Sequence, residues 1–305
     1  MKKRRKKSLP KKSFIYVNRT VILSLIILLI FCIGSFIFYK FVPSQIKSIV
    51  ETPKTEMKKI PSDVKEKLMK QTSLTVFRVP ILMYHYVEYV KDKKDIIRQS
   101  LDITPYTFEQ QVKTLQSVGF TFMTARELGE VIDGKMKLPK SPILLTFDDG
   151  HWDFDTVVLP ILKKYHVKAT AYIITGFIGR SDFMSKEELV DVINSKLVDV
   201  GAHTVHHVSL KGRPSSVLNY EIGQSKALLE NAYHISVVSF AYPGGAFDQK
   251  AIDAVKNAGF TTAVSTIPGI IQSSGNRFFL YRLRPGYRTG DVLLNYLRQN
   301  AFKAY

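Results

Sequence analysis

Cysteine is nearly absent from this chain, since Cys32 is the single one in 305 residues. It lies inside an apolar run near the amino terminus, so the remainder of the chain can form no internal disulfide bond. Small secreted scaffolds held together by disulfides are thereby excluded. If the rest of the chain lies outside the cytoplasm, as the next segment indicates, a domain of this size without disulfides is more typical of a bacterial enzyme that faces the cell wall.

Acidic residues are absent from the first twenty positions, which hold nine lysines and arginines. Subtracting these nine from the formal net charge of +18 leaves +9 for the rest of the chain. Residues 21–39 then carry no charge and are long enough to cross a bilayer as a helix. The basic flank predicts a cytoplasmic tail over 1–20, a single transmembrane helix over 21–39 and an extracellular remainder at the cell membrane. A cleaved signal peptide is the alternative, although no small-residue cleavage site follows the apolar run.

A glycine-rich phosphate-binding loop is also missing, so the sequence does not indicate a nucleotide partner. The basic tail adjoins an apolar span, which favours an orientation signal over nucleic-acid binding. Residues 40–74 are charged and contain three prolines, and they are predicted to form an extracytoplasmic stalk. Residues 75–305 are predicted to form the folded domain.

Strand-like and helix-like segments alternate along this domain, which predicts an α/β fold with a parallel sheet. About seven or eight such units, with polar residues at several strand ends, favour a closed barrel over an open sheet. Periodicity alone does not distinguish a seven-stranded from an eight-stranded barrel. Residues 89–100 are charged and are predicted to be a loop.

Two helix starts carry a capping-box signature. Thr124 is followed three residues later by Glu127, and Ser185 is followed in the same way by Glu188. A single long helix is predicted over 217–233 from its apolar spacing.

An apolar strand-like run, Ile143–Phe147, ends at two adjacent carboxylates, Asp148 and Asp149, followed by Gly150. Strand ends are where barrel and open-sheet enzymes keep their chemistry. Two adjacent carboxylates repel, so one resists ionisation unless a cation lies nearby. The alternative is a polar Asp-Gly turn after a core strand.

Three histidines follow another short apolar run, at positions 203, 206 and 207. His203 and His207 are four residues apart and share a face on a helical turn, and His203 with His206 would do so as well. Two imidazoles and one carboxylate are a usual ligand set for a catalytic zinc-like ion. The sequence therefore predicts a metal site, with a solvated polar turn as the alternative.

These segments resemble a known family. Thr146–Gly150, His203–His207 and Phe240–Gly245 resemble, in order, the first three motifs of the polysaccharide deacetylases, the NodB-homology domains of carbohydrate esterase family four. Ile81–His85 resembles the opening strand of the branch that includes the poly-N-acetylglucosamine deacetylases. The resemblance covers about residues 78 to 290 and implies a distorted (β/α)7 barrel.

The resemblance implies roles for the first two motifs. Asp149, His203 and His207 correspond to the metal ligands, and Asp148 corresponds to the general base. The implied metal is zinc, with nickel, cobalt or manganese as alternatives. Thr204 is expected to orient either its own loop or a substrate group.

The third motif follows a strand and is expected to line the wall of the site. In the family, the matching segment donates a backbone N–H to the oxyanion, and here Tyr242 and Gly244 occupy it. Gly244 stands where tyrosine is usual, which keeps the backbone donor and removes an aromatic side chain. A plain Pro-Gly turn is the alternative.

Two departures from the family pattern affect the catalytic groups. Ala241 stands where many members carry an arginine that orients the base, and Arg282 or Arg284 is expected to replace it. No histidine follows His234, so the late general-acid histidine is missing, and His85 is the candidate acid. The histidines at 151, 166 and 234 are expected to be surface or packing residues.

The resemblance therefore predicts a metal-dependent hydrolase that removes N-acetyl groups from an extracellular glycan and releases acetate. A poly-N-acetylglucosamine-type polymer is preferred over peptidoglycan, and O-acetyl removal is the same chemistry. The rival from another class is a catalytically inactive glycan-binding domain tethered to the membrane.

Overall fold

A computed structural model describes residues 75–301 of the chain. The predicted tail 1–20, membrane span 21–39 and stalk 40–74 lie outside the described residues. Within residues 75–301, no helix is both long and apolar enough to cross a membrane.

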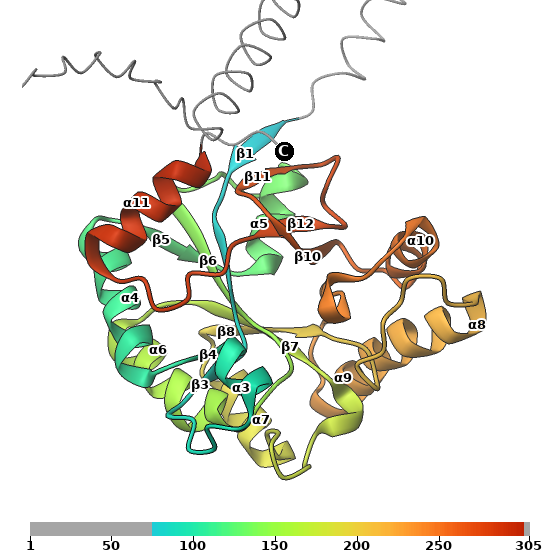
Figure 1. Ribbon diagram of the computed structural model, residues 1–305. Helices are drawn as coiled ribbons and strands as arrows, with labels where there is room; N and C mark the ends of the chain where they lie inside the picture. Colours follow the sequence, from blue (N-terminus) through green and yellow to red (C-terminus); the bar gives the residue numbers. More distant parts are fainter. Residues whose placement is uncertain (1–74, 302–305) are drawn as a thin grey trace, which may run out of the picture. The chain divides into compact units, whose positions relative to one another are not determined.

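The core of the domain is a nearly closed parallel barrel, which confirms the predicted fold class (Figure 1). Its strands follow one another in the order β2 (Ile81–Tyr84), β6 (Pro142–Phe147), β7 (Ala169–Ile173), β8 (Val198–Ala202), β9 (Ser239–Ala241), β10 (Thr262–Pro268) and β12 (Leu280–Arg282). A bridge between Leu82 and Leu283 joins the last strand to the first. A further strand, β5 (Thr121–Met123), pairs with the amino-terminal half of β6.

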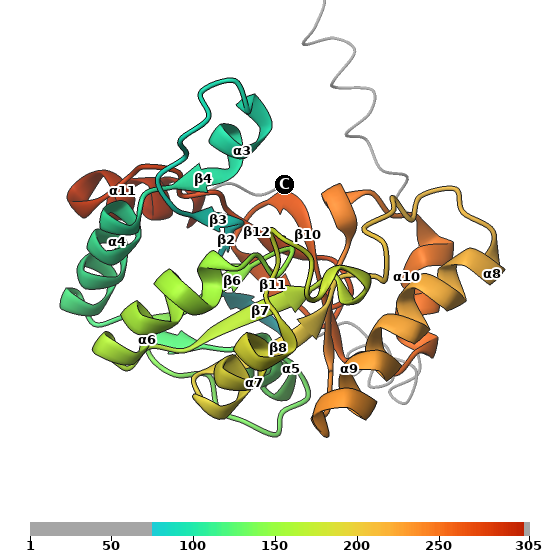
Figure 2. The same ribbon diagram turned by 90° about the horizontal axis from the view of Figure 1, so that it is seen from below.

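The barrel strands are apolar runs because both of their faces are covered. Every residue of β2, β6, β7 and β9 is buried. Helices surround the sheet, with α4 and α6 on one side and α9 and α10 on the other (Figure 2). The helices between and after the strands are α4 (Pro105–Ser117), α5 (Ala125–Ile132), α6 (Leu159–Tyr165), α7 (Lys186–Asn194), α8 (Ser215–Leu218), α9 (Ser225–Tyr233), α10 (Gln249–Asn257) and α11 (Gly290–Ala301).

Local sequence signals fix several helix starts. Thr124 and Ser185 accept hydrogen bonds from the backbone N–H groups of Glu127 and Glu188, whose side chains bond back to the caps. Both predicted capping boxes are therefore confirmed, and each satisfies two N–H groups that the helix leaves unpaired.

The long helix predicted over 217–233 is interrupted. Two α-helical segments, α8 and α9, flank a π-helical stretch, η3 (Asn219–Gln224). A π turn inserts an extra residue into the helix, and such turns often occur at functional sites. A second π stretch, η1 (Phe154–Val158), precedes α6.

The loop expected over 89–100 is wrong in part, because α3 (Ile96–Leu101) begins there. Asp95 caps α3 by accepting from the Arg98 N–H, a short-range signal that the run of charges obscured. The segment also forms a small sheet from β3 (Tyr86–Val87) and β4 (Asp102–Ile103), and Figure 2 shows α3 projecting from the barrel beside it.

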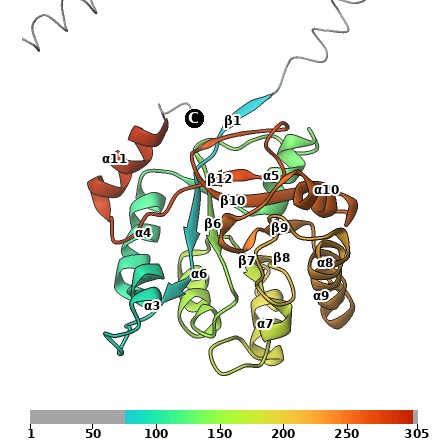
Figure 3. The same ribbon diagram turned by 45° about the vertical axis from the view of Figure 1, so that its right-hand side comes forward.

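A second small sheet covers another part of the domain. It pairs β1 (Val76–Arg78) with β11 (Ile271–Ser273), two short strands that the sequence did not predict. Near it, α11 lies beside α4 (Figure 3), so the last helix closes the domain against the first helix of the barrel.

Candidate active site

The predicted functional residues meet at one end of the barrel. His85 follows β2, Asp148 follows β6, His203 follows β8, and Arg282 is the last residue of β12. All of these strands are parallel. Their carboxyl ends therefore open on the same face, which is where barrel enzymes place their chemistry.

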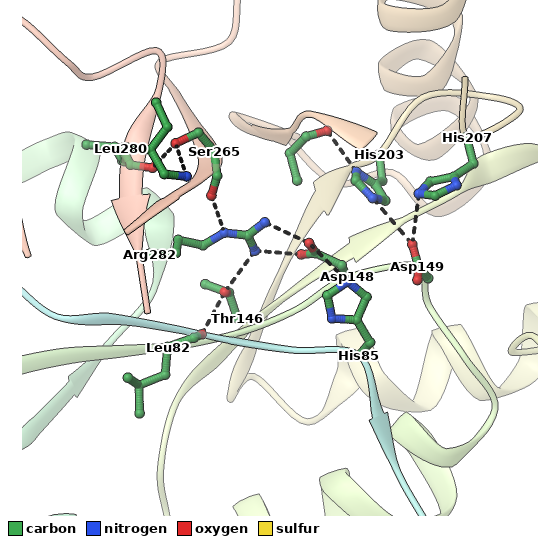
Figure 4. Close-up of polar contacts among 12 residues, drawn as sticks. Leu82, His85, Thr146, Asp148, Asp149, His203, His207, Ser265, Leu280 and Arg282 are labelled. Atoms are coloured by element: carbon green, nitrogen blue, oxygen red, sulfur yellow. Dashed lines mark hydrogen bonds and ion pairs between the residues drawn. The ribbon is translucent and has the colours of Figure 1, made fainter. Parts of the chain in front are cut away.

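Asp149, His203 and His207 form a cluster whose candidate ligand atoms all lie within 4.8 Å of one another. The Nε2 atoms of His203 and His207 are each 3.3 Å from Oδ1 of Asp149, and both rings point to this carboxylate in Figure 4. The His203 side chain is buried, whereas 39% of the His207 side chain is exposed. The cluster is thus open to solvent on its His207 side.

The donor set of this cluster suits a divalent cation. His203 donates its Nδ1 proton to the backbone oxygen of Ala241 at 2.8 Å, so the lone pair of its Nε2 faces Asp149. Oδ1 of Asp149 is buried and has no hydrogen-bond partner among the described residues. Two acceptors that face each other require positive charge between them, and two imidazoles with one carboxylate are typical ligands of catalytic zinc.

The electrostatics of the cluster also favour positive charge. Burial lowers the pKa of His203, but the contact with Asp149 and the negative charges of Asp148 and Asp149 outweigh it, and the pKa is raised. Burial raises the pKa of Asp149, yet the hydrogen bond from His151 and the nearby imidazoles of His203 and His85 hold it well below the usual range. The carboxylate is therefore ionised and ready to bind a cation.

Asp148 is held by a buried arginine from the far side of the barrel. Arg282 donates from Nη1 to Oδ1 and from Nη2 to Oδ2 of Asp148, both at 2.7 Å. The guanidinium is itself fixed by bonds to Thr146 and to the backbone oxygen of Ser265 (Figure 4). Burial raises the pKa of Asp148, but the charge of Arg282 and its hydrogen bonds outweigh this and hold the pKa below its usual value.

The two arginines predicted as partners of the base are placed differently. Arg282 is only 1% exposed and makes the bidentate pair, whereas Arg284 is exposed and makes no ion pair with Asp148 within residues 75–301. Of the two arginines expected to orient the base, Arg282 is therefore the one that pairs with Asp148.

His85 lies beside the same carboxylate. Its Nε2 is 4.0 Å from Oδ2 of Asp148, and 13% of its side chain is exposed. Burial lowers the pKa of His85 to about 4, although the charges of Asp148 and Asp149 oppose the shift. The imidazole is therefore neutral at pH 7 in the free protein.

The third motif requires one correction. The Tyr242 side chain is fully buried and donates to the backbone oxygen of Phe278, so it belongs to the core and does not line the site wall. Gly244 is exposed with a φ of 60° and open space around it. Thr204 is also fully buried, and its hydroxyl accepts from the His207 N–H at 2.9 Å. Of the two roles expected for Thr204, the structure fits loop orientation.

The alternative in which His206 replaces His207 does not match the structure. His206 donates from Nδ1 to Oε1 of Glu221 at 2.9 Å, and its ring is not part of the Asp149 cluster. Glu221 is a buried acid on η3 that sequence reasoning did not single out.

His151 was expected to be a surface or packing residue, and the structure shows a buried packing residue that also contacts Asp149. It is 4% exposed, its Nε2 is 3.3 Å from Oδ2 of Asp149, and its ring stacks on Tyr86 with centroids 3.8 Å apart. The sequence did offer one indication of this contact, since His151 is only two residues after the ligand candidate Asp149. His151 can orient Asp149 so that the other oxygen, Oδ1, faces the two histidines.

Comparison with known proteins agrees with this geometry. Residues 135–263 match the family described as polysaccharide deacetylase. This chain carries a polysaccharide deacetylase domain. The matched segment is the basis of the similarity to carbohydrate esterase family four, whose deacetylases are hydrolases.

Individual relatives of this deacetylase domain match over a longer stretch of the chain. A Bacillus subtilis protein described as a polysaccharide deacetylase, YxkH, is 28% identical over 207 residues, which cover 68% of this chain and 71% of the relative. The poly-beta-1,6-N-acetyl-D-glucosamine N-deacetylase of Staphylococcus aureus is 26% identical over 213 residues, covering 65% and 72%. Among solved structures, the Streptococcus pyogenes deacetylase PplD in complex with acetate gives a TM-score of 0.67 at 27% identity, covering 74% of this chain and 99% of that chain.

Proposed function

We propose that this deacetylase domain is a metal-dependent N-deacetylase, which hydrolyses N-acetyl groups of a polysaccharide that contains N-acetylglucosamine and releases acetate. The observation that carries the proposal is the buried, unpartnered Oδ1 of Asp149 between the Nε2 atoms of His203 and His207. The adjacent Asp148, held by Arg282, supplies a base at the same strand end. The name of the Staphylococcus aureus relative and the acetate bound to PplD support the reaction and its product.

Asp149, His203 and His207 would hold the metal, for which zinc is the first candidate and nickel, cobalt and manganese are alternatives. When bound, such an ion polarises the acetyl oxygen and lowers the pKa of water. Because His207 is the exposed ligand candidate, the acetyl group would approach from its side. Gly244 remains the predicted backbone donor to the developing oxyanion.

The proton transfers would fall to Asp148 and His85. Asp148 takes a proton from the attacking water, and Arg282 keeps both carboxylate oxygens in a fixed orientation while it does so. His85 is neutral at first, so it must accept a proton before it can give one to the departing amine. Its Nε2 lies 4.0 Å from Oδ2 of Asp148, so Asp148 would pass the proton that it takes from water to His85. Water and the N-acetyl group thus become acetate and an amine.

The proposed location follows from the amino-terminal sequence. Residues 21–39 would span the membrane once, with 1–20 in the cytoplasm, and 40–74 would space the domain from the bilayer. The substrate would then be a glycan of the cell surface or wall, such as poly-N-acetylglucosamine.

Removal of the metal tests the proposal directly. The purified full-length chain, stripped with a chelator, is expected to lose acetate release from N-acetylglucosamine oligomers, and added Zn²⁺ is expected to restore it. Acetate would be assayed on a panel that includes peptidoglycan and O-acetylated xylan. Release from xylan alone would favour an esterase, and oligomer binding without any release would favour the inactive glycan-binding domain.

His85→Ala tests the second proton carrier. A general acid typically contributes about 10² to 10⁴ in rate, so kcat is expected to fall by this factor while metal content stays constant. His166→Ala, on the exposed end of α6, serves as the control. A kcat for His85→Ala equal to that of the control would remove His85 from the mechanism.

A further inference from the structure

The loop that carries both histidine ligand candidates has an unfavourable backbone. Thr204 and His207 adopt φ angles of 66° and 55°, in the left-handed region that non-glycine residues rarely occupy. Such conformations persist only where surrounding contacts fix them. Something other than the loop's own preference must therefore hold it.

Glu221 supplies contacts of this kind. Its Oε2 accepts the backbone N–H groups of Val205 and His206 at 3.0 and 2.9 Å, and its Oε1 accepts from the His206 ring at 2.9 Å. The residue is 5% exposed. Its three hydrogen bonds all go to the segment between the two ligand candidates, His203 and His207.

The position of Glu221 in the fold explains how its side chain contacts the His203–His207 loop. It lies on the π-helical stretch η3, where the chain between α8 and α9 departs from α-helical geometry. The other side of the loop is held by η2 (Thr175–Phe177), whose Thr175 and Gly176 N–H groups donate to the backbone oxygens of Thr204 and Val205. A Cβ on Gly176 would lie 2.5 Å from the Val205 oxygen, so the two segments are in close contact.

We propose that Glu221 is a positioning residue that holds the His203–His207 loop in its ligand-ready shape before the metal arrives. This inference rests on the proposed metal-dependent function. The hydrogen bonds of the protein itself would order the loop, and the ion would then bind to a loop that is already formed. The carboxylate acts through backbone N–H groups, so its effect is on metal affinity and loop order, and it does not contact the substrate.

Hydrogen exchange of the metal-free, full-length wild type gives the first test. Peptides that contain the Val205 and His206 amides are expected to be protected without metal, because both N–H groups are bonded to a buried carboxylate. Rapid exchange that slows only after Zn²⁺ is added would show that the ion orders the loop, and the proposal would be wrong.

A matched pair of variants gives the second test. Glu221→Leu removes the acceptor of all three N–H groups, so Zn²⁺ affinity, measured by competition with a chromogenic chelator, is expected to fall about 10- to 100-fold. Glu230→Leu is the control, since Glu230 also accepts a backbone N–H, that of Val237, which is not part of the His203–His207 loop. Equal Zn²⁺ affinity in the two variants would overturn the proposal, whatever their melting temperatures.

Two further outcomes separate the causes. His206→Ala is expected to keep most of the affinity, because it leaves both backbone bonds to Glu221 in place. A wild-type protein that binds no divalent metal would contradict the proposed function itself, whereas tight binding that is unchanged in Glu221→Leu would contradict only the role of Glu221.

Discussion

Asp148→Asn is expected to retain the metal and to lose about 10² to 10⁴ in kcat, the usual contribution of a positioned general base. The variant keeps the shape of the side chain but cannot accept a proton from water. Asp149→Ala is expected to lose both metal and activity, because Asp149 alone places a carboxylate oxygen between His203 and His207. The measurements are metal content after dialysis and acetate release under saturating Zn²⁺.

The control for this pair must distinguish a loss of catalysis from a loss of folding, since Asp148 is also the partner of the buried Arg282. Far-UV circular dichroism and a melting curve for each variant provide it. Similar metal loss in Asp148→Asn and Asp149→Ala, with both proteins folded, would contradict the division of roles between the two aspartates.

Arg282→Met is expected to lower the free energy of unfolding by about 3 to 5 kcal/mol, because it leaves the buried carboxylate of Asp148 without its partner. Activity should fall as well, since the base loses both hydrogen bonds that orient it. Urea unfolding followed by circular dichroism measures the first effect. Arg284→Met is the stability control, because this neighbour is exposed and is expected to change stability by less than about 0.5 kcal/mol.

A double variant tests whether the loss comes from the unpaired charge. Arg282→Met combined with Asp148→Leu replaces the ion pair with apolar side chains, which often restores stability. The double variant is expected to be more stable than Arg282→Met alone and to be inactive. If it is less stable, packing around Arg282, and not its charge, would account for the effect.

The sequence predicted those parts of the site that depend on short-range patterns. Asp148 and Asp149 follow a buried strand directly, and His203 and His207 are four residues apart, so both motifs could be recognised in the linear chain. Placing them on one face needed only the rule that parallel strands end together.

The contacts that cross the fold were harder to predict. The pairing of Arg282 with Asp148, as opposed to Arg284, depends on the position of a three-residue strand along its neighbour. The two arginines are two residues apart, so strand alternation would place both on one face, and a shift of two residues would exchange them. Glu221 was missed because two of its three partners are backbone N–H groups, which leave no trace in the sequence, and the third, the His206 ring, is 15 residues away. Tyr242 was misplaced because an aromatic residue at a strand end fits the core as well as a site wall.

In the fold as well, the elements with clear short-range patterns were predicted and those without them were missed. The alternating pattern predicted the barrel and its helices, and the capping boxes at Thr124 and Ser185 fixed two helix starts. The short strands β1, β3, β4 and β11 have two or three residues each, too few for any period to be visible.

The ion pair between Asp148 and Arg282 joins positions 134 residues apart. A growing polypeptide that has been synthesised only as far as the histidine loop would already contain every ligand candidate for the ion, yet its nucleophile-activating aspartate would lack its counter-charge. The domain would then become active only after the final strand has docked. Acetate release would therefore require the complete fold, whereas metal binding would not.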